Sequence, residues 1–140
     1  MPGAGAVHHI KSVPRILVVD DQARVRAAIA VTLRAKGFEV VTVEDAVTAF
    51  GECEARPFDL AIVDVYMPSI DGVKLIKALR DRWRNLQIIV ISGVALNDSQ
   101  LTALDFLPKL SGFSEIACLK KPFRSEELLR AIRTALPTPA

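Results

Sequence analysis

The sequence predicts an α/β fold, in which a five-stranded parallel sheet is doubly wound and carries helices on both faces. Short runs rich in Val, Ile and Leu alternate with segments of helical periodicity. Strands that alternate with helices pair in parallel through right-handed crossovers. The strand runs are almost continuously apolar, as strands buried on both faces are. A length of 140 residues fits one domain with a sizeable core.

The composition excludes several functional classes. Hydrophobic residues make up 51% of the chain, which predicts folding rather than disorder. A formal charge of +2, from 18 basic and 16 acidic residues, is too balanced to indicate nucleic-acid or membrane binding. The apolar runs are too short to span a bilayer, and the first residues lack the apolar core of a signal peptide. We therefore expect a cytoplasmic protein in which Cys53 and Cys118 are reduced and no nucleic acid or membrane is bound.

The chain is expected to divide into three segments. Residues 1–14 are rich in Gly and Pro and indicate a flexible leader. Residues 15–136 form the domain, and residues 137–140 form a short tail. We expect a stand-alone domain with no effector domain after Leu136, unless the chain is a piece of a longer protein.

The first half of the domain begins with a strand, a helix and a second strand. Residues 16–19 form the first strand. Apolar positions then recur at helical spacing from Val25 to Leu33, and Gly37 ends that helix. Residues 39–43 form the β-rich second strand.

The second helix is expected to start after Asp45, whose side chain can cap it, and to run to about Ala55. Pro57 then breaks the helical pattern. The residues of this helix that are expected to face inward are Val47, Phe50 and Cys53.

The second half predicts three more strands, at residues 60–63, 88–91 and 116–119. Gly72 opens the helix between the first two of these strands, and its apolar face is formed by Leu75, Ile76, Leu79 and Trp83. Ser125 is expected to cap the last helix. The buried side of that helix is expected to contain Leu128, Leu129, Ile132 and Leu136.

Four of the strands lead into side chains that can carry chemistry. Asp20 and Asp21 follow the first strand, and Asp64, Ser92 and Lys121 follow later ones. Because the carboxyl ends of parallel strands meet at one edge, we expect one ligand site there. Carboxylates this close repel one another without a cation, and Mg²⁺ prefers oxygen ligands. The pattern therefore predicts a Mg²⁺ site, although strand-end aspartates also occur as turn and helix caps.

Within this cluster, Asp64 is the candidate nucleophile. A carboxylate can accept a phosphoryl group when a metal neutralises the charge around it. Ser92 can offer a hydroxyl and Lys121 an ammonium to the phosphoryl oxygens, because such transfer depends on positioning and charge neutralisation. Adjacent strand side chains point to opposite faces, so Lys120 is expected to be solvated.

The motifs around these residues resemble those of receiver domains in bacterial two-component response regulators. In chain order they are Val18-Val19-Asp20-Asp21, Asp64-Val65-Tyr66-Met67-Pro68 with Asp71-Gly72, Ser92-Gly93 and Lys121-Pro122-Phe123. The resemblance covers about residues 15–136. It implies a flavodoxin-like fold, like that of the chemotaxis receiver, with strand order 2-1-3-4-5.

The resemblance also implies a role for each motif residue. Asp64 is the expected phosphoacceptor, Ser92 the switch hydroxyl and Lys121 the lysine that binds the phosphoryl group. The Lys121–Pro122 peptide bond is expected to be cis. The expected Mg²⁺ ligands are Asp20, Asp21, Asp64 and the backbone carbonyl of Tyr66.

Three features of the sequence bear on signalling. Cys118 stands where the family usually has an aromatic switch residue, and we expect it to pack in the core. The segment from Ser92 to Lys121 is longer than usual by roughly two helical turns, which is expected to reshape the face that meets a partner. Tyr66 and Val94 are poor at orienting an attacking water, which predicts a long-lived phosphoryl group.

The resemblance implies a signalling switch rather than an enzyme with a separate substrate, since it would catalyse only its own phosphorylation and dephosphorylation. The expected partners are a sensor histidine kinase or histidine phosphotransfer protein, and a downstream protein bound through residues 97–118 and the last helix. Whether the chain forms a homodimer is left open by the sequence. Two other functional classes also stay open: a pseudo-receiver that binds a partner without phosphorylation, and a phosphatase of the haloacid-dehalogenase type. The latter needs an Asp two residues after Asp64, where this chain has Tyr66.

Overall fold

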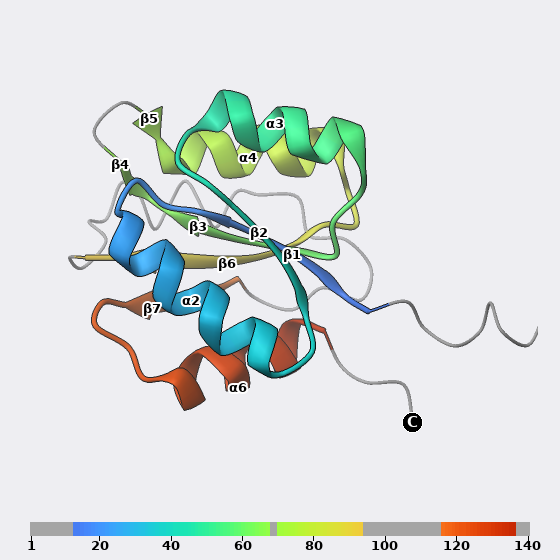
Figure 1. Cartoon of the computed structure of the whole chain (residues 1–140). Coiled ribbons are helices and arrows are strands. Elements are labelled where there is room, and N and C mark those ends of the chain that lie inside the picture. Colours follow the sequence, from blue (N-terminus) through green and yellow to red (C-terminus); the bar gives the residue numbers. More distant parts are fainter. Residues whose placement is uncertain (1–12, 68–69, 94–115, 137–140) are drawn as a thin grey trace, which may run out of the picture.

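The computed structural model describes residues 13–67, 70–93 and 116–136, in which helices cover a central sheet (Figure 1). The sheet contains β1 (Arg15–Val19), β2 (Glu39–Val43), β3 (Leu60–Asp64), β6 (Gln87–Ser92) and β7 (Ala117–Lys120). All pairs are parallel, and the strands lie in the order β2-β1-β3-β6-β7. Numbered along the chain within this sheet, the order is 2-1-3-4-5, so the predicted fold class is confirmed.

Helices pack on both faces of the sheet. On one face lie α3 (Ala46–Ala55) and α4 (Gly72–Arg82), and on the other lie α2 (Ala23–Ala35) and α6 (Ser125–Ala135) (Figure 1). Strand residues alternate between the two cores, so that Leu17 and Val63 face α3 and α4 while Ile16 and Ile62 face α2 and α6. This alternation explains the uninterrupted apolar runs, because both faces of each central strand are buried.

The ends of α2 and α3 follow the sequence signals. Gly37 follows α2 with a φ of 91°, a conformation that is costly for residues with a side chain. Asp45 caps α3, since its Oδ1 accepts a hydrogen bond of 2.8 Å from the backbone N–H of Thr48.

Only two of the three residues that were expected on the inward face of α3 pack in the core. Phe50 and Cys53 pack in the core, but Val47 is 84% exposed, so that expectation was wrong. Two positions along a helix turn the side chain roughly halfway around the axis, so Val47 lies opposite the buried Ala49.

The start of α6 differs from the prediction by one residue. Ser125 is the first residue of the helix rather than its cap, and the preceding Arg124 donates its backbone N–H to Glu127 Oε1 at 2.8 Å. This reach-back by a glutamate stabilises a helix start without a capping hydroxyl. The expected buried side is present: Leu128 and Ile132 are buried, and Leu129 and Leu136 are partly buried.

Two short strands were not predicted. β4 (Tyr66–Met67) and β5 (Ile70–Asp71) pair antiparallel directly after β3. Two residues are too few to show a hydrophobic period, so the sequence carried no signal for this ladder.

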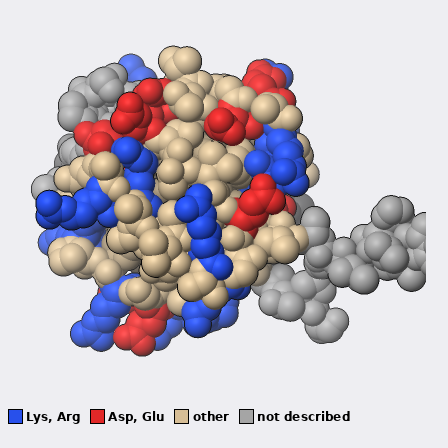
Figure 2. Space-filling view, in the orientation of Figure 1, with Lys and Arg blue, Asp and Glu red and all other residues tan. Residues whose placement is uncertain are grey.

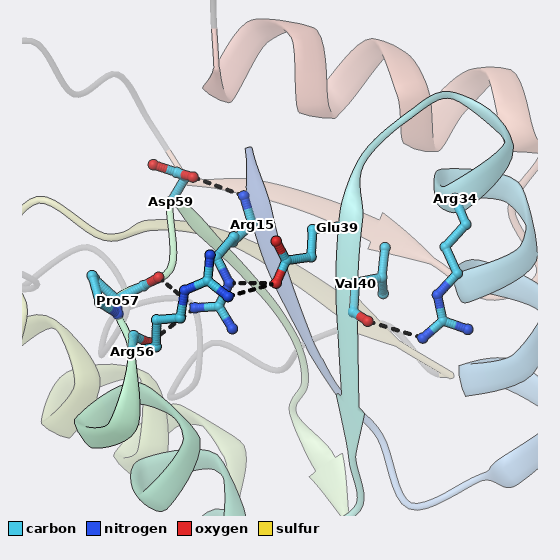
Figure 3. A network of polar contacts seen from close by, with 7 residues as sticks. All are labelled: Arg15, Arg34, Glu39, Val40, Arg56, Pro57 and Asp59. Atoms are coloured by element: carbon cyan, nitrogen blue, oxygen red, sulfur yellow. Dashed lines mark hydrogen bonds and ion pairs between the residues drawn. The ribbon is translucent and has the colours of Figure 1, made fainter. Parts of the chain in front are cut away.

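The amino ends of the strands are joined by a polar network (Figure 3). Arg15 Nε lies 2.8 Å from Glu39 Oε2, and its Nη1 donates to the carbonyls of Arg56 and Pro57 at 3.1 and 2.7 Å. The backbone N–H of Arg15 donates to Asp59 Oδ2 at 2.7 Å. The network therefore fastens β1 to β2 and to the turn before β3.

On the face seen in Figure 2, basic and acidic side chains are interspersed with uncharged surface. Within the residues that the structure describes, no helix combines the length and the apolar character that crossing a membrane requires.

Candidate functional site

Parallel pairing brings the predicted site residues to one edge of the sheet. Asp64 and Ser92 are the last residues of β3 and β6, and Asp20 and Lys121 directly follow β1 and β7. Ser92 lies opposite Lys120 in the ladder, so the ends of β6 and β7 are level. The edge is therefore lined by groups from four different strands.

Three of the site side chains are buried. Asp20 is 0%, Asp64 2% and Ser92 5% exposed. Asp21 is exposed, and the side chain of Lys121 is 14% exposed. Burying two carboxylates is costly unless a cation compensates their charge.

Lys121 supplies part of that compensation. Its Nζ lies 2.8 Å from Asp20 Oδ2 and 3.0 Å from Asp64 Oδ2. A third partner is Gln22 Oε1, which accepts from Nζ at 2.8 Å. Burial by itself would lower the pKa of Lys121, but the interactions with the carboxylates of Asp20 and Asp64 outweigh it, and the pKa is raised above its ordinary 10.5. The ammonium is therefore charged at neutral pH, whereas the neighbouring Lys120 is exposed, as expected.

The carboxylates of Asp20, Asp21 and Asp64 are arranged so that they could hold a metal ion. One oxygen of each lies within 4.8 Å of the others. Asp20 Oδ2 is buried and, within the described residues, has a charge contact with Lys121 but no hydrogen bond of good geometry. A buried acceptor of this kind beside two further carboxylates fits a hard divalent cation. Tyr66 begins β4 just after this cluster, and the role of its carbonyl as a ligand stays a prediction.

Several hydrogen bonds fix Asp20 at the end of β1. Its N–H donates to the carbonyl of Val43 at 3.2 Å, and its own carbonyl accepts from Arg26 Nη1 at 2.7 Å. The backbone N–H of Gln22 donates to Asp20 Oδ1 at 2.8 Å. Sequence reasoning missed Gln22 and Arg26, although residues that open a helix directly after a strand must stay close to the strand end.

The backbone behind Asp64 is held by a close approach of α4. A Cβ on Gly72 would lie 2.6 Å from the carbonyl oxygen of Asp64 and closer still to Cα of Val65. A larger residue at this position would push the start of α4 away from the end of β3. Gly72 therefore supports the site by allowing two backbones to touch.

The ends of β6 and β7 are also joined through their backbones. The carbonyl of Ser92 accepts a hydrogen bond from the N–H of Lys121 at 2.7 Å. The Lys121–Pro122 peptide bond is cis, as the resemblance implied. The hydrogen bond between Lys121 and Ser92 places the backbone of Lys121 beside the buried end of β6.

Cys118 does not occupy the expected place. It is exposed, so the expectation that it packs in the core was wrong. β7 is an edge strand, and α6 packs against it on the side of Ala117 and Leu119. The longer segment that was expected to shape a partner surface, residues 97–115, lies outside the described residues.

Comparison with known proteins finds relatives among the response regulators. The sequence profile described as the response regulator receiver domain matches residues 16–133. The transcriptional regulatory protein PrrA of Mycobacterium leprae is 35% identical over 126 residues, which cover 89% of this chain and 51% of that protein. The response regulator MprA of a Mycobacterium species is 33% identical over 122 residues, which cover 87% of this chain and 50% of that protein. The chain thus spans about half the length of the curated relatives it matches.

Solved structures agree with the sequence relatives. The chemotaxis protein CheY4 of Vibrio cholerae superposes with a TM-score of 0.78 at 26% identity, covering 89% of this chain and all of that one (100%). A CheY-like receiver domain of Methanospirillum hungatei gives a TM-score of 0.78 at 24% identity, covering 87% and 92% of the two chains. With the strand order and the matched profile in agreement, the chain belongs to the family of receiver domains of two-component response regulators.

Proposed function

We propose that this chain is a phosphorylation-dependent signalling switch in which Asp64 accepts a phosphoryl group. The observation that carries the proposal is the position of Asp64 at the end of β3, with Lys121 Nζ 3.0 Å from its Oδ2 and with Asp20 and Asp21 close enough to share a cation. A nucleophilic carboxylate, a fixed ammonium and a cation site together fit phosphoryl transfer, which depends on positioning and charge neutralisation.

The phosphodonor in this proposal is a phosphohistidine on a sensor histidine kinase or phosphotransfer protein. An oxygen of Asp64 attacks the phosphorus, and the N–P bond of the donor breaks as the new O–P bond forms. The donor ring, protonated on its other nitrogen, takes the N–P electron pair and leaves as neutral imidazole. The chain in this way takes part in its own phosphorylation and later dephosphorylation, and turns over no separate substrate.

The residues around Asp64 divide the remaining tasks. Asp20, Asp21, Asp64 and the carbonyl of Tyr66 would hold Mg²⁺, which when bound offsets the negative charge of the phosphoryl group. Lys121 remains charged, which suits it to bind a phosphoryl oxygen. Ser92 is buried beside the site and offers its hydroxyl to another phosphoryl oxygen.

The output in this proposal is a change in protein contacts. A phosphoryl group adds up to about two negative charges next to the buried edge of the sheet. That charge biases the segments at the ends of β6 and β7, and the downstream protein is bound through residues 97–118 and α6. With Tyr66 and Val94 at the positions two residues past Asp64 and Ser92, the phosphoryl group is expected to persist well beyond seconds.

The test is incubation of the protein with Mg²⁺ and phosphoramidate, followed by intact mass spectrometry. We expect a mass gain of one phosphoryl group in the wild-type protein and in Asp59→Asn, which makes the same chemical change at the other end of the sheet. Asp64→Asn should show no gain, and chelation of Mg²⁺ should abolish it. A wild-type protein without any gain would instead favour a binding module that works without phosphorylation.

A further inference from the structure

Gln22 makes a contact in the site that the proposed roles do not use. It occupies the N-cap position of α2, and its Oε1 accepts a hydrogen bond of 2.8 Å from Lys121 Nζ. Its backbone N–H donates to Asp20 Oδ1, also at 2.8 Å. The side chain of Gln22 therefore starts from a main chain that is itself fastened to the site.

Two of the three close contacts of the Lys121 ammonium are hydrogen bonds, to Asp64 and Gln22, and the third is a charge contact with Asp20. A lysine ammonium has three N–H donors. Lys121 Nζ lies 2.8 Å from Asp20 Oδ2, 3.0 Å from Asp64 Oδ2 and 2.8 Å from Gln22 Oε1. Two partners are buried carboxylates, and the third is the neutral amide of an exposed residue.

The three partners hold the ammonium from two sides. The buried carboxylates of Asp20 and Asp64 attract it toward the protein interior, whereas the amide of Gln22 binds it from the solvent side. A cavity of about 570 Å³ between α2 and α6 is lined by both Gln22 and Lys121, which gives these two side chains room to rearrange.

We propose that Gln22 is a positioning residue for Lys121. Its carbonyl oxygen gives the ammonium a third partner, which the ammonium can keep when it exchanges a carboxylate contact for a phosphoryl group on Asp64. The proposal rests on the proposed function of Asp64 as phosphoacceptor. Gln22 acts through Lys121 and has no part in the bonds that form and break.

The chemistry of position 22 predicts which substitutions matter. Methionine has a similar length but offers no strong acceptor, so in Gln22→Met the ammonium is held by Asp20 and Asp64 alone and competes more strongly with the incoming cation. Glutamate restores an oxygen at the same reach, so Gln22→Glu keeps the third partner of the ammonium. All variants retain the backbone N–H that donates to Asp20, so a purely structural role of the main chain stays unchanged.

The kinetic test measures phosphorylation by phosphoramidate with Mg²⁺ across a range of donor concentrations. In Gln22→Met we expect the rate constant at saturating donor to fall about tenfold, the size of a lost hydrogen bond to a charged group. Gln22→Glu should recover most of that loss. The matched control is Gln87→Met at the amino end of β6, which should keep the wild-type rate. A wild-type rate in Gln22→Met, or no recovery in Gln22→Glu, overturns the proposal.

A second readout uses the protein without metal or phosphodonor. The ¹⁵N-labelled ammonium of Lys121 should give a slowly exchanging NMR signal in the wild-type protein and in Gln22→Glu, and this signal should shift or broaden in Gln22→Met. An unchanged signal in Gln22→Met contradicts the proposal. If the wild-type protein takes no phosphoryl group, the proposed function fails, while this signal still decides whether Gln22 holds Lys121.

Discussion

The two ends of β1 carry polar clusters that differ in charge balance. The cluster at the amino end matches two guanidinium groups with two carboxylates, those of Arg15, Arg56, Glu39 and Asp59 (Figure 3). The cluster at the carboxyl end sets the ammonium of Lys121 among the three carboxylates of Asp20, Asp21 and Asp64. The first cluster is balanced by the chain itself, and the second leaves negative charge for a cation to offset.

The physical consequence is a division of tasks along one strand. Arg15 also donates to two backbone carbonyls, and its guanidinium lies 4.2 Å from the centroid of the Phe58 ring, so the amino end is satisfied by the fold. The carboxyl end buries like charges at a cost in stability, which is how functional sites commonly differ from structural ones. Neutralising a carboxylate should therefore lower stability at the amino end and raise it at the carboxyl end.

The largest expected effect concerns the backbone support of the carboxyl end. Gly72→Ala should lower the free energy of unfolding by about 3 kcal/mol, since its Cβ would overlap the backbone of Asp64 and Val65. The control is Gly51→Ala within α3, where a Cβ meets nothing within 4 Å, and which should raise stability by about 0.5–1 kcal/mol. Urea unfolding measures both variants. Equal effects in the two would show that the close approach of α4 does not matter.

The second-largest expected effect on stability is at the amino end of β1. Arg15→Met should lower the free energy of unfolding by about 2 kcal/mol, because two carbonyls and a carboxylate lose their shared donor. Phosphorylation of Asp64 should keep its wild-type rate, since Arg15 lies at the opposite end of β1. Arg124→Met, where the side chain is 80% exposed, should change stability by less than about 0.5 kcal/mol. A slower phosphorylation of Arg15→Met would mean that the two ends are coupled.

At the carboxyl end of β1 we expect a smaller change, and there a substitution should raise stability. In the presence of a chelator, Asp20→Asn should raise the free energy of unfolding by about 1 kcal/mol, because one of the crowded carboxylates is neutralised. Mg²⁺ should then add little stability, whereas it stabilises the wild-type protein by binding the folded state. The same change at the amino end, Asp59→Asn, should lower stability. Clearly reduced stability of Asp20→Asn in chelator would contradict this account.

The smallest effect is a pH dependence at the amino end. The hydrogen bond from Arg15 holds the pKa of Glu39 below its ordinary value of 4.5. A carboxyl group with a lowered pKa in the folded state contributes stability above its ordinary pKa and loses it as the pH falls through the lowered value. Urea midpoints of the wild-type protein and Glu39→Gln should thus differ at neutral pH and converge once the pH has fallen below the lowered pKa of Glu39. A constant difference across this range would show that the Glu39 carboxylate is unimportant.

Local signals in the sequence were enough for most elements and for the order of the site residues. Gly37 and Asp45 marked helix ends because left-handed backbone and side-chain capping depend on one or two residues. Val47 was misplaced because a single apolar residue does not reveal which side of a helix faces the core. Cys118 was misplaced because burial on an edge strand depends on which helix covers it.

The sequence by itself determined the alternation of strands and helices, the strand order through its resemblance to receiver domains, and the residues at the strand ends. Those features are periodic or carried by short motifs. The tertiary structure decided how the site residues meet: the contacts of Lys121 with Asp20, Asp64 and Gln22, and the close approach of Gly72. Such contacts join residues that are far apart in the chain, and their distances are set only when strands distant in the sequence pair and bring their ends together.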